Sequence, residues 1–154
     1  MEKLEYNFFI FGKRLIIENM KNTKRNLSWY LNRNQKYVGI HLIADFWGAK
    51  IIEDSKKIEA ILLNAAKAGK NKPLKVVIYK FPYQGITGIV LLKESHIAIH
   101  SWPEIDYLAI DIFTCGKKSL PYEALKYLKE EFTPRRIIIK EIKRGKIEDN
   151  IKKI

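Results

Sequence analysis

"GITGIVLLKESHIAIHSW", residues 85–102, contains two apolar segments separated by the short polar link Lys93–Ser95. Both segments are rich in isoleucine and valine, whose branched side chains favour β-strands. A link this short suits a hairpin, whereas parallel strands need a crossover of a dozen or more residues. The stretch therefore predicts two neighbouring antiparallel strands, joined at a turn that carries Glu94 and Ser95.

Segments on both sides of this hairpin extend the pattern. Apolar residues predict further strands over residues 37–48, 75–81, 106–116 and 135–142. A helical stripe predicts a helix over 54–69, with Asp54 or Ser55 as its N-cap and Gly69 at its end.

A second helix is predicted over residues 119–132, with Ser119 as its cap and Pro121 in its first turn. The expected order is strand, helix, three strands around the hairpin, strand, helix, strand. Strands without crossovers favour an antiparallel sheet, so we expect an α+β fold: a two-layer sandwich, mostly antiparallel sheet with two helices on one face. The sheet face opposite the helices must either be covered as well or serve a function of its own.

The 154 residues suit one folded domain, preceded by an extension. Residues 39–154 carry the regular pattern, whereas residues 1–38 form an N-terminal extension of unknown role. The net charge of +12 raises nucleic acid as a partner. However, residues 1–38 and 133–154 each carry eight basic and three acidic residues, so the charge lies at the two ends. Solvent-exposed charged residues at the two chain ends explain the net charge better than a nucleic-acid site does, so nucleic-acid binding is not favoured.

Composition also bears on the compartment. No run of about 18 apolar residues predicts a membrane span, and the first residues do not resemble a secretory signal. The single cysteine, Cys115, excludes an internal disulfide and suits a reducing compartment. The cytoplasm is the expected location.

The turn of the hairpin has a chemical interpretation. Ser95 could attack the carbonyl before it, given a strained peptide and a nearby base. His100 is a candidate base, and Cys115 is a second acid–base group one strand later. In a straight strand Ser95 and His100 point to opposite faces, so this interpretation requires an irregular backbone at Ser95. The alternative is that these are ordinary polar residues on a solvated strand face.

Four segments together resemble the prokaryotic S-adenosylmethionine decarboxylases, the pyruvoyl enzymes of polyamine synthesis. They are "GIHLIADFWGA", "FPYQGITGIVLLKESHIAIHSWPE", "DYLAIDIFTCG" and "EIKRG", and they span residues 39–145. Glu-Ser-His, then His-x-Trp-Pro-Glu, then Phe-Thr-Cys-Gly form a specific ordered set.

The resemblance implies a proenzyme that cuts itself between Glu94 and Ser95. Ser95 Oγ would attack the Glu94 carbonyl, and His100 would help to eliminate the resulting ester. A pyruvoyl group derived from Ser95 would remain as the cofactor, with no metal. Such a ketone acts as an electron sink once it forms a Schiff base with the substrate amine, and Cys115 would then return a proton to the substrate.

The resemblance also implies substrate contacts. Phe81 matches an aromatic that stacks on adenine, although it could simply pack in the core. Glu104 matches a carboxylate that binds the ribose hydroxyls, with a solvated turn residue as the alternative. Trp102 could line the pocket or only pack. Thr87 stands where the family usually has serine, and it keeps the hydroxyl that would orient the processing site.

Three other positions have a structural interpretation. His96 follows the scissile pair, His41 lies on the first strand of the domain, and Ala49 replaces a cysteine that is common in the family.

The implied substrate is S-adenosylmethionine, whose decarboxylated product is the aminopropyl donor for polyamines. A pyruvoyl-dependent arginine decarboxylase of the same family is the alternative.

The resemblance implies a homodimer with shared sites. Tyr107, Ala109 and Phe113 would form an apolar set on the sheet face without helices, and a second protomer would cover that face. Alternatively, the extension with its apolar residues 8–11 folds back over the same face.

Overall fold

The computed structural model describes residues 36–147 in full and the backbone of residues 6–11 and 14–19. The two N-terminal segments are strands, β1 (Tyr6–Phe11) and β2 (Arg14–Asn19), which pair antiparallel into a sheet of their own. They lie within the extension, where the sequence predicted no regular elements. The side chains of residues 8–11, and hence their proposed folding over the open face, lie outside the described residues.

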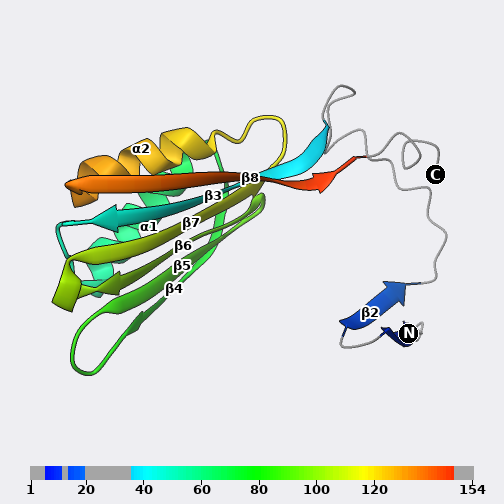
Figure 1. Cartoon of the computed structure of the whole chain (residues 1–154), viewed down its shortest axis with the longest axis horizontal. Coiled ribbons are helices and arrows are strands. Elements are labelled where there is room, and N and C mark those ends of the chain that lie inside the picture. The colour runs from blue at the N-terminus through cyan, green and yellow to red at the C-terminus, as the bar shows by residue number, and fades with distance from the viewer. Residues whose placement is uncertain (1–5, 12–13, 20–35, 148–154) are drawn as a thin grey trace.

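A six-stranded sheet is the main element of the fold, in the order β4-β5-β6-β7-β3-β8, and each neighbouring pair is antiparallel. Two helices lie on one face of this sheet (Figure 1). The predicted two-layer α+β sandwich is therefore confirmed. The elements are β3 (Tyr37–Trp47), α1 (Ser55–Ala68), β4 (Pro73–Lys80), β5 (Ile86–Leu92), β6 (Ser95–Trp102), β7 (Tyr107–Cys115), α2 (Pro121–Phe132) and β8 (Arg136–Lys146).

Alternation along the strands divides the sheet into two faces. In β7, Leu108, Ile110 and Ile112 are buried against the helices, and the residues between them point the other way. Burying each such side chain contributes about 1.5–3 kcal/mol. The helix-covered face therefore holds the core, and the opposite side, called the open face below, carries no helix from the described residues.

Helix α1 begins as predicted. The Asp54 carboxylate accepts a hydrogen bond from the Lys57 backbone N–H at 2.8 Å, so Asp54 rather than Ser55 is the N-cap. Gly69 ends the helix. The predicted stripe is the buried one: Ile58, Ile61, Leu62, Ala65 and Ala66.

Helix α2 corrects one prediction. Its N-cap is Leu120, which makes no side-chain capping bond, and Pro121 is in the first turn. The Ser119 hydroxyl instead donates to the Asn71 side-chain oxygen at 2.7 Å. Ser119 is thus used to tie the start of α2 to the end of α1, and this tertiary contact replaces the local cap.

The edge strand β8 is longer than predicted. It continues from the expected end at residue 142 to Lys146, which pairs with Tyr37 at the start of β3. The added residues are mostly charged, and an edge strand tolerates them because one of its sides faces solvent. Strand β3 begins at Tyr37, where the sequence predicted the start of this strand.

The open face is partly apolar. Tyr107, Ala109 and Phe113 lie on it, as the alternation predicted. Several large side chains on the face are exposed by more than a third: Trp47, Val77, Tyr79, Ile89, Leu91 and Ile142. Neither helix found in residues 36–147 is long and apolar enough to cross a membrane.

Candidate active site

The β5–β6 turn places Ser95 in an unusual backbone conformation. Its φ angle is +143°, a region that favours glycine. A residue held in such a region costs about 1–3 kcal/mol and persists only where its surroundings impose it. Here the Glu94 side chain accepts a hydrogen bond from the Lys72 N–H at 2.8 Å, and Ser95 pairs with Thr114 of β7. The backbone is thus irregular at the position where the chemical interpretation requires it.

The Glu94 carbonyl, which precedes Ser95, accepts two hydrogen bonds from one residue. The Cys115 backbone N–H donates at 3.0 Å, and the Cys115 thiol donates at 3.1 Å. Two donors on one carbonyl oxygen polarise the carbonyl, and they would stabilise negative charge that develops there. The carbon atom open to attack is therefore activated in the folded chain.

The thiol can donate because it stays protonated. Burial raises the pKa of Cys115 above its ordinary value, and the nearby Glu94 carboxylate raises it further. Gly39 allows this arrangement, because a Cβ at Gly39 would lie 2.7 Å from the Thr114 carbonyl oxygen. Strand β3 can therefore approach β7 closely where Cys115 lies.

The Ser95 hydroxyl lies 3.2 Å from His96 Nδ1. His96 was interpreted from the sequence as structural, so this contact is one that the sequence reasoning missed. Glu94, Ser95, His96 and Cys115 together are called the turn cluster below.

His100 belongs to a second group of residues. Its Nδ1 is 2.6 Å from the Thr87 hydroxyl, so the threonine does keep a hydroxyl in contact with this histidine. Two aromatic rings flank the imidazole: Trp102 at 4.0 Å and Phe81 at 5.7 Å between ring centroids. Together with Glu104, these residues are called the aromatic cluster below.

Polar contacts position the rim of the aromatic cluster. Glu104 lies in a short 3-10 helix (Pro103–Ile105) and accepts a hydrogen bond from the Gln84 side chain at 3.1 Å. Phe81 is 37% exposed, so a ligand could reach part of this residue from solvent. Nothing in the sequence indicated that Gln84 contacts Glu104.

The two clusters lie at opposite ends of the open face. Ser95 and His100 are five residues apart on β6, a separation of about 17 Å along an antiparallel strand. The structure therefore brings Ser95, Glu94 and Cys115 together, but it does not bring His100 to Ser95 within one chain.

A group of polar and charged side chains lies close to the turn cluster, around His41, which is level with Phe113 and His96 in the strand register. His41 Nε2 is 3.1 Å from Asp111 Oδ1, and Arg144 Nη1 is 3.4 Å from His41 Nδ1. At the other end of the open face, beside Trp102, the Tyr107 hydroxyl donates to Asp45 at 2.6 Å, and burial together with this bond raises the pKa of Tyr107 to about 12. His41 is thus a hydrogen-bonded strand histidine, as its structural interpretation expected.

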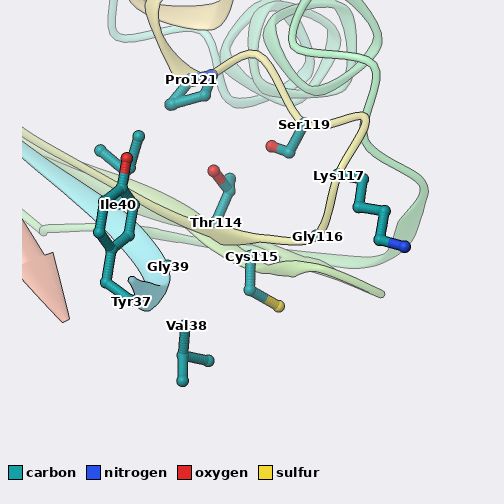
Figure 2. Close-up of a pocket in the computed structure, with 10 residues that line it drawn as sticks. All are labelled: Tyr37, Val38, Gly39, Ile40, Thr114, Cys115, Gly116, Lys117, Ser119 and Pro121. Atoms are coloured by element: carbon teal, nitrogen blue, oxygen red, sulfur yellow. The ribbon is translucent and has the colours of Figure 1, made fainter. Parts of the chain in front are cut away.

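A cavity of about 320 Å³ lies beside the turn cluster, lined by Tyr37, Val38, Gly39, Ile40, Thr114, Cys115, Gly116, Lys117, Ser119 and Pro121. Figure 2 shows the Thr114 and Ser119 side chains on the side of Pro121, whereas the Cys115 sulfur points to the opposite side of its strand. Because Cys115 is one of the lining residues, the cavity borders the turn cluster. None of the aromatic-cluster residues lines it. Across the described part of the chain, no group of three or more potential metal ligands converges.

Fold and geometry together define a two-layer α+β protein with a serine at a strained turn and a polarised carbonyl before it. The family model for S-adenosylmethionine decarboxylase matches residues 40–145. The S-adenosylmethionine decarboxylase proenzyme of Pelotomaculum thermopropionicum is 42% identical over 112 residues, which are 71% of this chain and 89% of the relative. The proenzyme of the same name from Methanococcus maripaludis is 40% identical over 120 residues, or 76% of this chain and 98% of the relative.

A solved structure agrees. The crystal structure of the adenosylmethionine decarboxylase from Aquifex aeolicus superimposes with a TM-score of 0.69 at 35% identity, covering 75% of this chain and 97% of that one. The chain belongs to the S-adenosylmethionine decarboxylase family, and the resemblance seen in the sequence is confirmed.

The strain at Ser95 gives a prediction about stability. Both Ser95→Gly and Ser95→Ala remove the hydroxyl, but only glycine adopts a φ of +143° without strain. Glycine also loses more backbone entropy on folding, so we expect Ser95→Gly to be more stable than Ser95→Ala by a net of about 1 kcal/mol. Urea denaturation of the two variants measures this difference. An alanine variant as stable as the glycine variant would show that the turn is not strained.

Proposed function

We propose that the chain is a proenzyme that cleaves itself between Glu94 and Ser95 and thereby gains the pyruvoyl group with which it works. The enzyme decarboxylates S-adenosylmethionine and so supplies the aminopropyl donor for polyamine synthesis. The observation that carries the proposal is the turn cluster, where a strained Ser95 follows a carbonyl that accepts two hydrogen bonds from Cys115.

Self-cleavage begins with an acyl shift. Ser95 Oγ loses its proton and attacks the Glu94 carbonyl carbon, and the negative charge on the Glu94 oxygen is stabilised by the Cys115 N–H and thiol. The carbon–nitrogen bond then breaks, and the Ser95 nitrogen takes up a proton. The former peptide is now an ester between Glu94 and the Ser95 side chain, and the backbone strain at Ser95 is released.

The ester is removed by elimination. Loss of the Ser95 α-proton expels the Glu94 carboxylate, and addition of water with loss of ammonia leaves a pyruvoyl group at the new N-terminus. His100 is the base proposed for the α-proton, assisted by the hydroxyl of Thr87, with which it is hydrogen-bonded.

The residues around Ser95 fit such a group. When bound, a pyruvoyl group supplies the electron sink that decarboxylation of an amino acid needs. Cys115 lies beside residue 95 with a raised pKa, so its thiol holds a proton at neutral pH. That proton is available to the substrate carbon after carbon dioxide leaves.

The aromatic cluster is the proposed site for the nucleoside. The Phe81 ring is partly exposed and suits stacking on adenine, with Trp102 beside it. Glu104 is exposed, and Gln84 holds its carboxylate, which suits a pair of ribose hydroxyls. Arginine has no planar nucleoside to use these groups, and the relatives compared above are named for S-adenosylmethionine. The arginine alternative is therefore not favoured.

A homodimer is proposed because the two clusters are complementary yet separated. A two-fold axis that runs across the strands would set the turn cluster of one protomer over the aromatic cluster of its partner. His100 and Thr87 of one chain would then act on Ser95 of the other. The same contact would bury the exposed apolar side chains of the open face, among them Tyr79 and Leu91.

Removal of the nucleophile tests the processing. Ser95→Ala should remain one uncut chain without decarboxylase activity, because alanine has no hydroxyl for the acyl shift. Ser55→Ala, at the start of α1, is the matched control and should be cleaved and active. Gel electrophoresis and release of carbon dioxide provide the two readouts. Cleavage of the Ser95→Ala chain at this bond would contradict the proposal.

Mixed dimers test the shared site. Ser95→Ala and His100→Ala chains should each be inactive alone, but a mixed dimer contains one site with Ser95, Cys115 and the partner's His100 intact. Random co-assembly makes half of the dimers mixed with one of two sites active, so about one quarter of wild-type activity should return.

The control for this experiment pairs two changes within the turn cluster, Ser95→Ala and Cys115→Ala, which should not complement each other. If Ser95→Ala and His100→Ala chains form mixed dimers without activity, the site is not shared. An active wild-type protein that sediments as a monomer would also show that the site is not shared.

The substrate contact of Glu104 gives a further prediction. Glu104→Gln should raise the KM for S-adenosylmethionine by about 5- to 150-fold, which corresponds to about 1–3 kcal/mol for weakened hydrogen bonds to the ribose. Glu130→Gln, on the exposed side of α2, is the control. Steady-state kinetics of carbon dioxide release measure both. An unchanged KM would remove Glu104 from the site, and faster turnover of arginine would contradict the substrate.

A further inference from the structure

The acyl shift needs a group that takes the proton of the Ser95 hydroxyl, and a general base must lie within hydrogen-bonding distance of that proton. His100 is hydrogen-bonded to Thr87 at the far end of β6. Within the same chain, the basic atom in contact with Ser95 Oγ is His96 Nδ1 at 3.2 Å. This contact exists before any second chain arrives.

The surroundings of His96 keep its ring in place. The imidazole meets the Phe113 ring edge-on, with ring centroids 6.0 Å apart, and the His41 ring at 6.3 Å. Leu91 of β5 and Phe113 of β7 are its direct partners in the strand register. The side chain is thus held between two neighbouring strands, next to the turn.

We propose that His96 is the general base of the self-cleavage. Its Nδ1 takes the proton of Ser95 Oγ as the oxygen attacks the Glu94 carbonyl carbon. The same proton then passes to the Ser95 nitrogen as the carbon–nitrogen bond breaks, so His96 is restored at the end of the shift. This inference rests on the proposed function, and it separates two roles: His96 acts in ester formation and His100 in ester elimination.

The electrostatic environment supports a neutral imidazole. Burial lowers the pKa of His96 below its ordinary value of 6.5, and the charge of His41 lowers it further, whereas Asp111 raises it. Arg144 from β8 contacts His41, and Glu94 lies in the adjoining turn. Because the lowering effects dominate, His96 is unprotonated at neutral pH, as a base must be.

The test follows cleavage of the full chain during cell-free synthesis across a range of pH. In the wild type, the rate should rise with pH as His96 loses its proton and should level off above a midpoint below 6.5. In His96→Gln this rise should vanish, and the rate at neutral pH should fall by about 10²–10⁴-fold. His41→Gln is the matched control: it should be cleaved within a few-fold of the wild-type rate and keep the rise with pH.

Two further readouts separate a base from a structural residue. Added imidazole should restore cleavage of His96→Ala, whose fold is checked by circular dichroism. Hydroxylamine, which cuts esters, should release fragments from a stalled His100→Ala chain but not from His96→Gln, because the latter stops before the ester.

The outcomes are distinguishable. A His96→Gln chain that is cleaved at the wild-type rate with the same pH dependence would overturn the inference and leave the proposed function standing. Hydroxylamine-sensitive ester in that variant, or a folded His96→Ala chain that imidazole does not rescue, would also overturn it. A wild-type chain that is never cleaved would instead overturn the proposed function.

Discussion

The hydrogen bonding of one carbonyl group connects the fold to the chemistry. The Glu94 oxygen accepts both the N–H and the thiol of Cys115, and this contact ties the β5–β6 turn to the end of β7. The antiparallel sheet makes it possible, because β6 and β7 are neighbours and the end of β7 lies beside the start of β6. The contact also helps to hold Ser95 at a φ of +143°, a conformation that its residue type does not favour. Strain and activation therefore arise at the same bond, and the proposed cleavage of that bond would relieve the strain.

Separation of functions along the sheet is the second organising feature. The turn cluster holds the proposed scissile bond, and the aromatic cluster holds His100 and the proposed nucleoside site. The turn cluster and the aromatic cluster are far apart within one chain. A second copy laid on the open face in the reverse direction would bring the turn cluster of one chain to the aromatic cluster of the other. His96, by contrast, contacts Ser95 within its own chain. We therefore propose that the first step of self-cleavage uses residues of one chain, whereas elimination and catalysis also use residues of the partner.

Much of this was predictable from the sequence, because alternation, caps and short links are local signals. They predicted the six strands of the main sheet and both helices, and they limited the cap of α1 to Asp54 or Ser55. Contacts between distant residues were not predictable in this way. Ser119 was expected to cap α2 but bonds Asn71, and β8 extends because Tyr37 pairs with Lys146. The resemblance indicated Ser95, His100 and Cys115, yet only coordinates show that His100 lies at the other end of β6 and that His96 touches the serine hydroxyl.

Everything proposed for the turn cluster depends on whether the folded chain breaks its own backbone before Ser95. Mass spectrometry of the purified, denatured wild-type protein tests it most directly. We expect two fragments, residues 1–94 and 95–154, with the second beginning in a pyruvoyl group that blocks Edman degradation. A single intact chain of 154 residues, or a second fragment that begins with an ordinary serine, would contradict it.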